Sequence, residues 1–263
     1  MNKIRIVSLY SGSVGNATLI ETAKTSILID AGKSARALCA SLRQVGSDAE
    51  RLDAVFVTHE HTDHISALEV FLKKHRIPVH MTSFSAQRIP GARMPNLRDC
   101  IREHTPAFTE RVGDLTVKSF VLSHDSAMCV GYTVETDFGY RFGVATDTGY
   151  ITDGMSCLDG CDSVMIESNH NVDMLLCGPY PAELKHRIRS KHGHLSNDDC
   201  AALACRLARS GTKRFMLAHL SEENNTPESA TCTVGRALSP FGDVCLCVAK
   251  PREETVLVSH AEN

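Results

Sequence analysis

The strongest constraint on the fold lies at Thr58, where an apolar segment runs directly into a cluster of metal-binding side chains. The segment Asp53–Thr58 (D-A-V-F-V-T) is rich in β-branched residues and predicts a buried strand. The residues that follow read H-E-H-T-D-H, and a helix is predicted over His64–His75. The cluster therefore belongs to a loop at the carboxyl end of a strand, which is where α/β folds place their ligands.

The metal-binding side chains of this loop are His59, His61, Asp63 and His64. The first two lie two residues apart in extended chain and can point toward one ion. Asp63 and His64 lie in the first turn of the helix and point toward a second position. A plainer interpretation is a polar surface loop with Asp63 as the helix N-cap. Three imidazoles bring no advantage to a cap, so the pattern favours metal binding.

Four ligands cannot complete the coordination of two ions, so further donors are expected at other strand ends. His124 follows F-V-L-S, Asp147 follows F-G-V-A-T, and His219 follows F-M-L-A. Each alone is typical of an ordinary capped strand end, but with the upstream motif they predict a site for two divalent ions. Mixed imidazole and carboxylate ligands suit Zn or Mn, with Fe as a further option. Two ions about 3.5–4 Å apart generate hydroxide at neutral pH.

Strands and helices alternate along the rest of the chain. Strands are predicted at Ile4–Tyr10, Ala17–Glu21, Ser26–Asp30, Leu115–Leu122, Val130–Glu135, Tyr140–Ala145, Ser163–Ile166, Arg214–Ala218, Val244–Val248 and Thr255–Val258. Further helices are predicted at Ser34–Val45, Ser196–Ser210 and Pro227–Leu238. This order predicts an α/β or α+β arrangement of layers around two sheets, in a single domain over residues 1–263.

Composition narrows the classes of function. The net charge of the 263 residues is -3, so any contact with nucleic acid must come from a local positive patch. The N-terminus lacks an apolar signal core, and no run reaches the ~18 apolar residues of a membrane span. The eleven cysteines form no C-x-x-C pair, which predicts reduced, mostly buried thiols rather than a zinc-cysteine site. These features predict a cytoplasmic protein that does not interact with membranes.

Two stretches between Asp147 and His219 exceed what a plain hydrolase needs. They are I-E-S-N-H-N, with Glu167 and His170, and K-H-G-H-L-S-N, with His194. An acidic residue and histidines outside the metal ligands could supply a general acid for a poor leaving group. The alternative is that they cap elements or pair structurally.

The segment L-K-H-R-I-R-S-K-H is a local positive focus within a cap-like region of about residues 168–195. Its basic residues are Lys185, Arg187, Arg189 and Lys191. Alone, such a run is typical of a solvated helix face, but beside a two-metal site phosphate contact is the better interpretation. The looser group Arg88, Arg93, Arg98 and Arg102 could extend this track.

The N-terminal S-G-S-V-G-N is either a glycine-rich turn or a loop whose backbone approaches a phosphate, with Ser13 and Asn16 as contacts.

The order of the metal motifs resembles that of the metallo-β-lactamase superfamily over nearly the whole chain. The resemblance implies an αββα four-layer sandwich with the metals at one edge. It implies one ion on His59, His61 and His124. It implies a second ion on Asp63, His64 and His219, with Asp147 bridging. Asp30, at the end of I-L-I-D-A-G, would be the aspartate that orients the ligand loop.

A finer resemblance covers about Leu9 to Asn225. The motifs S-G-S-x-G-N-A-T, V-T-H-E-H-T-D-H, T-D-T-G-Y, E-S-N-H, G-H-L-S-N and A-H-L-S resemble the YycJ (WalJ) branch of the superfamily. Members are regarded as 5′→3′ DNA exonucleases linked to mismatch repair, which implies a DNA substrate rather than RNA. Ribonuclease Z is more distantly similar, with a glutamate placed like Glu167 and a histidine placed like His194. The chain has no room for the long tRNA-clamping arm of that family.

The resulting hypothesis is phosphodiester hydrolysis by a metal-bridged hydroxide that Asp63 or Asp147 orients. His194, held by Glu167, protonates the leaving oxygen, and His170 contacts the scissile phosphate. Three alternatives remain open: a ribonuclease similar to ribonuclease Z, a small-molecule ester, thioester or lactam hydrolase, and a non-catalytic module with structural metal. The sequence does not specify the metal, the polarity of digestion or the oligomeric state.

Overall fold

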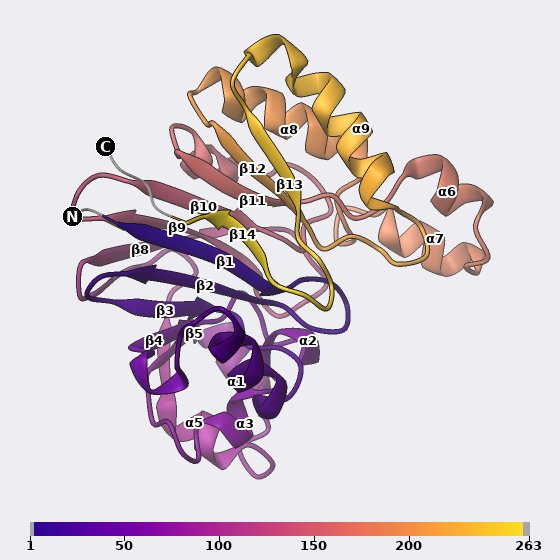
Figure 1. Ribbon diagram of the computed structural model, residues 1–263. Helices are drawn as coiled ribbons and strands as arrows, with labels where there is room; N and C mark the ends of the chain where they lie inside the picture. Colours follow the sequence, from indigo (N-terminus) through magenta and orange to yellow (C-terminus); the bar gives the residue numbers. More distant parts are fainter. Residues whose placement is uncertain (1–2, 260–263) are drawn as a thin grey trace.

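The chain folds around two seven-stranded mixed sheets that pack face to face (Figure 1). The structure, a computed structural model, describes residues 3–259. The first sheet has the order β14-β1-β2-β3-β4-β5-β6. Its strands are β1 Ile4–Tyr10, β2 Ala17–Thr22, β3 Ser26–Ile29, β4 Ala54–Phe56, β5 Val79–Thr82, β6 Ile101–His104 and β14 Thr255–Val258.

The second sheet has the order β13-β12-β11-β10-β9-β8-β7. Its strands are β7 Thr109–Val112, β8 Leu115–Val121, β9 Val130–Thr136, β10 Arg141–Ala145, β11 Ser163–Glu167, β12 Arg214–Ala218 and β13 Cys245–Val248. Each sheet has an antiparallel half and a parallel half. Strands β3 to β6 run parallel in one sheet, and β10 to β13 run parallel in the other.

Helices cover both outer faces and complete the four predicted layers (Figure 1). Beside the first sheet lie α1 Ala35–Gln44, α3 Leu68–Phe71 and α5 Pro95–Cys100; beside the second lie α8 Asn197–Arg209 and α9 Pro227–Leu238. Shorter helices are α2 Thr62–Ile65, α4 Ser83–Arg88, α6 Val172–Cys177 and α7 Ala182–Ile188, with 3-10 turns at Ala49–Arg51, Asp153–Leu158 and Ser239–Phe241.

Three apolar clusters hold the layers together. Phe56 and Tyr132 meet between the sheets, with ring centroids 5.7 Å apart, while Leu38 of α1 and Leu203 of α8 lie in the two outer clusters. Within the predicted strand Asp53–Thr58, Asp53 is exposed and residues 54–58 are buried on both faces, because a sheet covers one side and helices the other. Since one cluster joins both sheets, we propose that the chain is a single domain.

The predicted helix at His64–His75 is wrong, because the structure has two short helices there. The carbonyl of His64 accepts from Ala31 N at 2.8 Å, and Ala67 N donates to Ala31 O at 3.0 Å. The carbonyl of Asp63 accepts from Asn16 N at 2.8 Å. These groups are the ones that a continuous helix would pair internally, so the chain breaks between α2 and α3.

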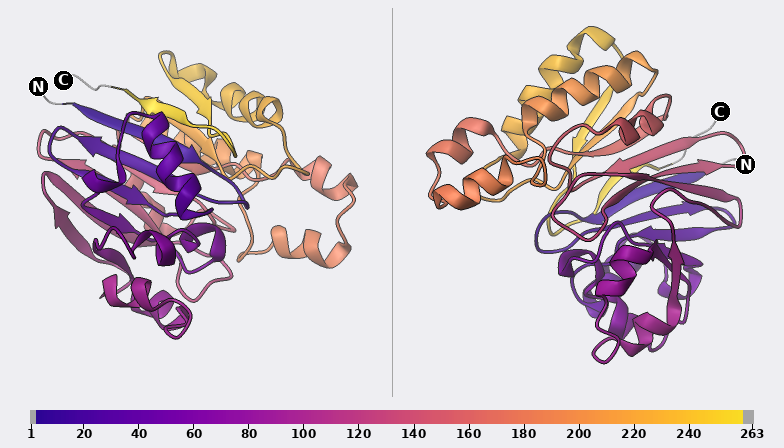
Figure 2. Two further views of the ribbon diagram at one scale, coloured as in Figure 1. Left: turned by 60° about the horizontal axis from the view of Figure 1, so that its bottom comes forward. Right: turned by 180° about the vertical axis from the view of Figure 1, so that it is seen from behind.

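The helices α6 and α7 of the predicted cap stand apart from the four layers (Figures 1 and 2). Their region, residues 168–195, connects β11 to α8.

All eleven cysteines are free thiols, but only four of them are buried, so the prediction of mostly buried thiols is wrong. Within residues 3–259, no helix combines the length and apolarity needed to cross a membrane.

Candidate metal centre

The predicted metal ligands come together at one edge of the two sheets, in the segments that follow β4, β8, β10 and β12. Their side chains form overlapping groups in which donor atoms lie within 4.8 Å of one another. These groups are His59, His61 and His124; His59, His64 and Asp147; Asp63, His64 and His219; and Asp147, Glu167, His194 and His219. The convergence agrees with the rule that strand ends of layered folds carry the site.

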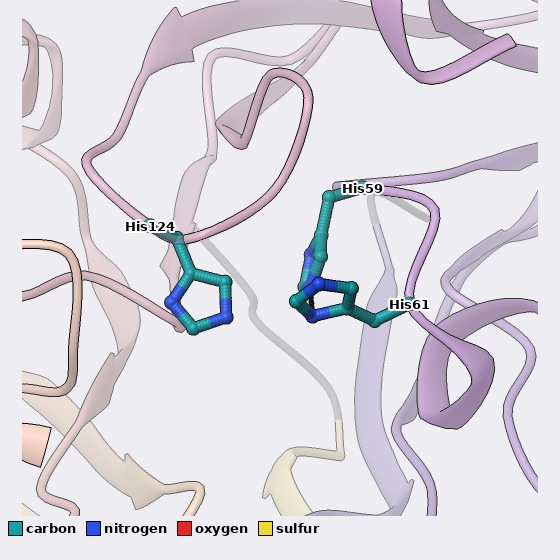
Figure 3. Close-up of side chains that lie close together, drawn as sticks. All are labelled: His59, His61 and His124. Carbon is teal, nitrogen blue, oxygen red and sulfur yellow. Dashed lines mark hydrogen bonds between the residues drawn. The ribbon is translucent and has the colours of Figure 1, made fainter. Parts of the chain in front are cut away.

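The first group consists of three imidazoles that face a common point (Figure 3). His59 Nε2 lies 2.9 Å from His61 Nδ1. The ring centroid of His124 lies 5.1 Å from that of His59 and 5.2 Å from that of His61. His124 Nδ1 faces the carbonyl of Gly193 at 3.2 Å, which leaves its Nε2 for the shared point. Three imidazoles in this arrangement are the ligand set that a zinc-class ion takes.

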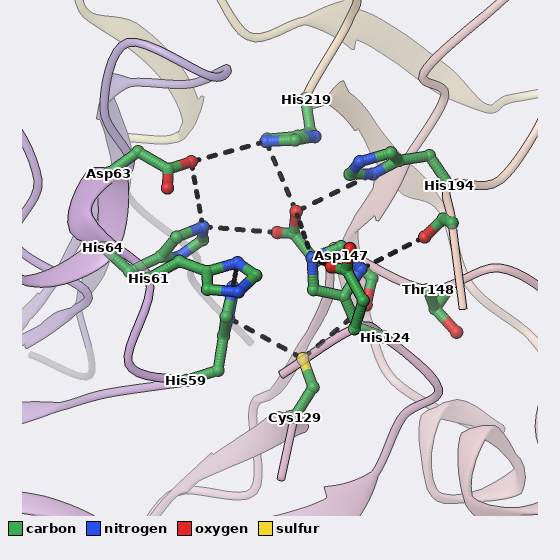
Figure 4. Close-up of polar contacts among 12 residues, drawn as sticks. His59, His61, Asp63, His64, His124, Cys129, Asp147, Thr148, His194 and His219 are labelled. Carbon is green, nitrogen blue, oxygen red and sulfur yellow. Dashed lines mark hydrogen bonds and ion pairs between the residues drawn. The ribbon is translucent and has the colours of Figure 1, made fainter. Parts of the chain in front are cut away.

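The second group centres on Asp147 (Figure 4). Its Oδ2 lies 3.5 Å from His64 Nε2, and its Oδ1 lies 3.4 Å from His219 Nε2 and 4.0 Å from His124 Nε2. Asp63 Oδ2 lies 3.4 Å from His64 Nε2 and 3.9 Å from His219 Nε2. Asp147 is thus within reach of both groups, as a bridging carboxylate must be.

Two buried atoms of this group are without hydrogen bonds. Asp147 Oδ2 and His219 Nε2 find no hydrogen-bond partner among residues 3–259, although Asp147 is 2% exposed and His219 is 4% exposed. Buried polar atoms without a partner are costly and rare. Both atoms point toward the other ligands, so divalent ions would satisfy them, and the residues present fit such ions.

Asp30, to which the family resemblance assigns a supporting role, is hydrogen-bonded to the ligand loop at two points. Its Oδ2 accepts from His64 Nδ1 at 2.8 Å, which holds His64 Nε2 toward Asp63 and Asp147. Its Oδ1 accepts from the backbone N of Thr58 at 2.8 Å. An imidazole whose second nitrogen is bonded to a carboxylate is fixed in tautomer and orientation, which strengthens it as a metal ligand.

The backbone is unusual at three strand ends of the site. Asp30, Asp147 and His219 have φ values of 62°, 62° and 56°, in the left-handed region that non-glycine residues seldom adopt. Such conformations cost roughly 1–3 kcal/mol each and cluster at functional sites. Gly32 is needed for a different reason, the close approach of the ligand loop. A Cβ at this position would lie 1.9 Å from the carbonyl oxygen of Asp63.

Charges within the site oppose the effect of burial. Burial lowers the pKa of His219, but the nearby carboxylates of Asp147, Asp63 and Glu167 raise it to about 10. Asp30 and Asp147 likewise raise the pKa of His64 against burial. Burial and the neighbouring imidazoles lower the pKa of His59. Ions that bind at His64 and His219 must displace protons.

One carboxylate oxygen of Glu167 is hydrogen-bonded to two histidines. Its Oε1 lies 2.7 Å from His194 Nδ1 and 3.1 Å from His219 Nδ1. Its Oε2 accepts from the backbone N of Thr148 at 2.9 Å and of Leu195 at 3.2 Å. Burial raises the pKa of Glu167, but the charge and hydrogen bond of His194 outweigh it and keep the carboxyl ionised. Glu167 in turn raises the pKa of His194 against burial.

A pocket of about 190 Å³ opens beside the predicted metal ligands. Some of the predicted phosphate contacts line this pocket and others do not. Ser13, Arg187 and His194 line it, together with His124 and His219. The remaining predicted contacts are not in its lining: Asn16, His170, Lys185, Arg189 and Lys191.

Asn16 lies behind the ligands. Its Nδ2 is 3.1 Å from His64 Nε2 and 3.3 Å from Asp63 Oδ2, and its Oδ1 accepts from Gly12 N at 2.9 Å. The residue is 7% exposed. It therefore positions the glycine-rich loop against the metal ligands, and the structure does not bear out its direct contact with phosphate.

His170 is 2% exposed, and its Nδ1 has no hydrogen-bond partner among the described residues. Burial lowers its pKa to about 4. A neutral, buried imidazole outside the pocket lining is poorly placed to touch the scissile phosphate.

Lys185 Nζ donates to the carbonyl of Leu176 at 2.7 Å, which joins α7 to α6. Arg187 Nε donates to Asp125 Oδ2 at 2.7 Å.

Sequence reasoning missed Asp125, Cys129 and Tyr180. Asp125 Oδ1 lies 3.2 Å from His124 Nε2, and the residue also carries the ion pair with Arg187 of the cap. Its position directly after His124 was an available signal. The Cys129 thiol lies 3.8 Å from His59 Nδ1. Tyr180 lines the pocket from the segment before α7, and no spacing in the sequence indicates this.

Known proteins are similar to this chain in both sequence and structure. A family profile described as the Beta-lactamase superfamily domain matches residues 25–220. An exodeoxyribonuclease WalJ of Streptococcus pneumoniae is 36% identical, over 88% of this chain and 87% of its own. An exodeoxyribonuclease YycJ of Bacillus anthracis is 35% identical, over 89% of both chains.

Among solved structures, the metallo-beta-lactamase fold protein YhfI from Bacillus subtilis superimposes with a TM-score of 0.70. It is 16% identical and covers 97% of this chain and 100% of its own. At this identity the likeness supports the four-layer fold alone.

Proposed function

The chain belongs to the metallo-β-lactamase superfamily, in the branch of the WalJ and YycJ exodeoxyribonucleases, and from this premise we propose that it is a metal-dependent DNA exonuclease. The observation that carries the proposal is the convergence of seven potential metal ligands beside the hydrogen-bonded pair His194 and Glu167. His124, His194 and His219 of this cluster line the adjoining pocket. Zinc or manganese fits the mixed imidazole and carboxylate ligands, with iron as a further option.

The ligands divide as the superfamily pattern implies. We assign one ion to His59, His61 and His124, and a second to Asp63, His64 and His219, with Asp147 shared. When bound, such ions supply a nucleophile at neutral pH and neutralise charge on the attacked phosphate. We assign the orientation of the attacking water to Asp63 or Asp147, because both carboxylates lie among the histidine ligands (Figure 4).

His194 is the acid in this account. Its Nδ1 is bonded to Glu167, so its Nε2 remains available in the pocket that it lines. The charge and hydrogen bond of Glu167 raise the pKa of His194 against burial, which favours the protonated imidazole that an acid requires. That proton passes from Nε2 to the leaving alkoxide oxygen as its bond to phosphorus breaks. Glu167 touches neither substrate nor nucleophile, so its role is to position His194 and His219.

Specific features favour a DNA substrate over the two alternative substrate classes, RNA and small molecules. The relatives at 35–36% identity are exodeoxyribonucleases, which argues against a ribonuclease. The basic cap of residues 168–195 beside the pocket argues against a small-molecule ester, thioester or lactam hydrolase. A cytoplasmic location and a role in DNA repair, with digestion from 5′ to 3′, are parts of the same proposal.

A substrate panel tests this function. The metal-loaded chain is offered duplex and single-stranded DNA labelled at either end, RNA of the same sequence, and a thioester. We expect mononucleotides from the 5′ end of DNA, and loss of that activity in Asp147→Ala. Hydrolysis of the thioester with all nucleic acids intact would contradict the proposal, as would faster digestion of RNA.

A further inference from the structure

The helix α7 is unusual because none of its residues is buried, although it carries apolar side chains at regular spacing. Tyr180, Leu184 and Ile188 are four residues apart, so they fall on one face of the helix and of the turn before it. In a helix that packs on a core, such a stripe would be covered. Here the three side chains are half-buried and line the pocket of the metal centre.

Most of the other residues that line this pocket are polar. They include His124, His194 and His219 of the site already described, together with Ser13 and Ser221, while Leu220 is apolar. The pocket therefore joins the apolar, partly aromatic face of α7 to histidines of the candidate metal centre. A ligand that matches both must have a flat apolar face attached to an anion, and a nucleotide has this chemistry.

The volume of the pocket limits the size of its ligand, and contacts of the cap hold the apolar wall in place. The pocket volume of about 190 Å³ is below the ~300 Å³ at which ordinary ligand sites begin, so it suits one base and not the end of a stacked duplex. The wall is held in place from both sides. Arg187 donates to Asp125 beside His124, and Gly149 allows the chain at Lys191 to approach, since a Cβ there would lie 2.3 Å from the Lys191 carbonyl.

We propose that Tyr180, Leu184 and Ile188 form a slot for the base of the terminal nucleotide, the one that hydrolysis releases. The inference rests on the proposed exonuclease function and names its specificity-determining wall. The Tyr180 ring stacks on the base, and the two aliphatic side chains complete the apolar surface. Stacking does not depend on base identity, because every base has a π face. Holding one unpaired base beside the metal ligands places a single phosphodiester at the site, so digestion proceeds one nucleotide at a time.

The test compares DNA ends with and without a base. Two duplexes of one sequence carry at the 5′ end either a normal nucleotide or a tetrahydrofuran abasic nucleotide, with the same phosphates. For the wild-type chain we expect kcat/KM for the first cleavage to fall about tenfold on the abasic end, within the range of a stacked base. Tyr180→Ala should be slow on both ends and lose the difference, whereas Tyr180→Phe should keep it.

Binding provides a second readout that does not depend on catalysis. In chelator, fluorescence anisotropy of an oligonucleotide labelled at its 3′ end should show the same loss of affinity for the abasic end and for Tyr180→Ala. Leu184→Ala should weaken discrimination in the same direction if Tyr180→Ala fails to fold. The matched control is Leu176→Ala on α6, an apolar residue that is 46% exposed and outside the pocket lining, which should behave as wild type.

Equal rates on both ends with robust cleavage would overturn the slot and leave the exonuclease function intact. Loss of discrimination in Tyr180→Phe would also overturn it, since the ring is then not the feature that matters. Absence of cleavage of any DNA by the metal-loaded wild-type chain would overturn the function and the slot together.

Discussion

At the scale of single residues, the site depends on carboxylates that hold histidines rather than on the ligands alone. Asp30 holds His64, and Glu167 holds both His194 and His219. In each of these contacts the carboxylate accepts a hydrogen bond from Nδ1 of the histidine, which directs Nε2 of the same ring into the site. A substitution at either residue therefore changes the orientation of a ring without removing a donor atom.

Replacement of Asp30 tests the effect on metal binding. Asp30→Asn should lower the affinity for divalent ions about 10- to 100-fold, because His64 loses the charged partner that orients it. Competition between the chain and a chelating dye measures this affinity. Asp53→Asn is the matched control, since that carboxylate accepts from Ser26 N at the start of a strand and touches no ligand. Unchanged affinity in Asp30→Asn would contradict the supporting role.

Removal of His194 tests the acid. His194→Ala should lower kcat on DNA about 10²- to 10⁴-fold, because the alkoxide then leaves without a proton. The rate on bis-p-nitrophenyl phosphate, whose leaving group needs no proton, should change less than about tenfold. Steady-state kinetics on both substrates measures the difference. Equal losses on the two substrates would show that His194 acts on something other than the leaving group.

At the scale of elements, the seam between the two sheets contains a second set of histidines. His80 of β5 and His104 of β6 share a hydrogen bond of 2.9 Å between Nδ1 and Nε2. The His80 ring stacks on Phe56, with centroids 4.6 Å apart, and the two histidine rings are inclined by 23°. Two ring nitrogens 2.9 Å apart share a proton in an N–H···N bond, which requires both histidines to be neutral or to hold one charge between them.

This pair predicts a dependence of stability on pH. Burial, His104 and Arg102 lower the pKa of His80 from its ordinary value of 6.5 to about 4, and burial lowers the pKa of His104 despite Glu110. The unfolded chain then binds the proton more readily, so stability is full above pH 6.5 and is lost as the pH falls toward 4. When the pH is lowered from 7.5 to 5, protonation of His80 in the unfolded chain should reduce the free energy of unfolding by roughly 2 kcal/mol.

Urea denaturation at both pH values, with chelator present, checks this expectation. His80→Phe keeps a ring against Phe56 and removes the titrating group, so its loss of stability between the two pH values should be smaller by about that amount. An identical loss in the variant and the wild type would assign the pH dependence to other groups.

Elements with strong apolar patterns could be predicted from the sequence, and weakly patterned ones could not. The strand Ile4–Tyr10 and the helix Pro227–Leu238 were predicted with their correct bounds, because burial and capping mark them. Strands β6 and β7 have four residues each, lie at sheet edges and are largely exposed, so no alternation marks them. The break between α2 and α3 arises from bonds to Ala31, which no local pattern contains.

The same distinction holds for the site. Donors at the ends of apolar strands, such as His124 and His219, could be found because each follows a recognisable strand. The roles of Asn16 and Tyr180 could not be found, because they depend on which loop faces which. Asn16 was predicted to contact phosphate, and only the tertiary structure shows that its side chain contacts Asp63 and His64.

At the scale of the whole molecule, the fold brings residues from both halves of the chain to one edge. The candidate ligands, from His59 to His219, come from loops of both sheets, and the cap adds a wall that neither sheet provides. Packing between the two sheets therefore fixes the distance between the two sets of candidate metal ligands. The central claim is that this shared edge, loaded with two ions, cleaves DNA.

The most direct measurement is a titration of Zn or Mn into the chelator-stripped chain, with release of mononucleotides from end-labelled DNA followed at each step. We expect no release from the stripped chain, a rise with added metal, and a plateau at two ions per chain, with Asp147→Ala inactive throughout. Release of nucleotides by the stripped chain, or intact DNA after two ions have bound, would contradict the account.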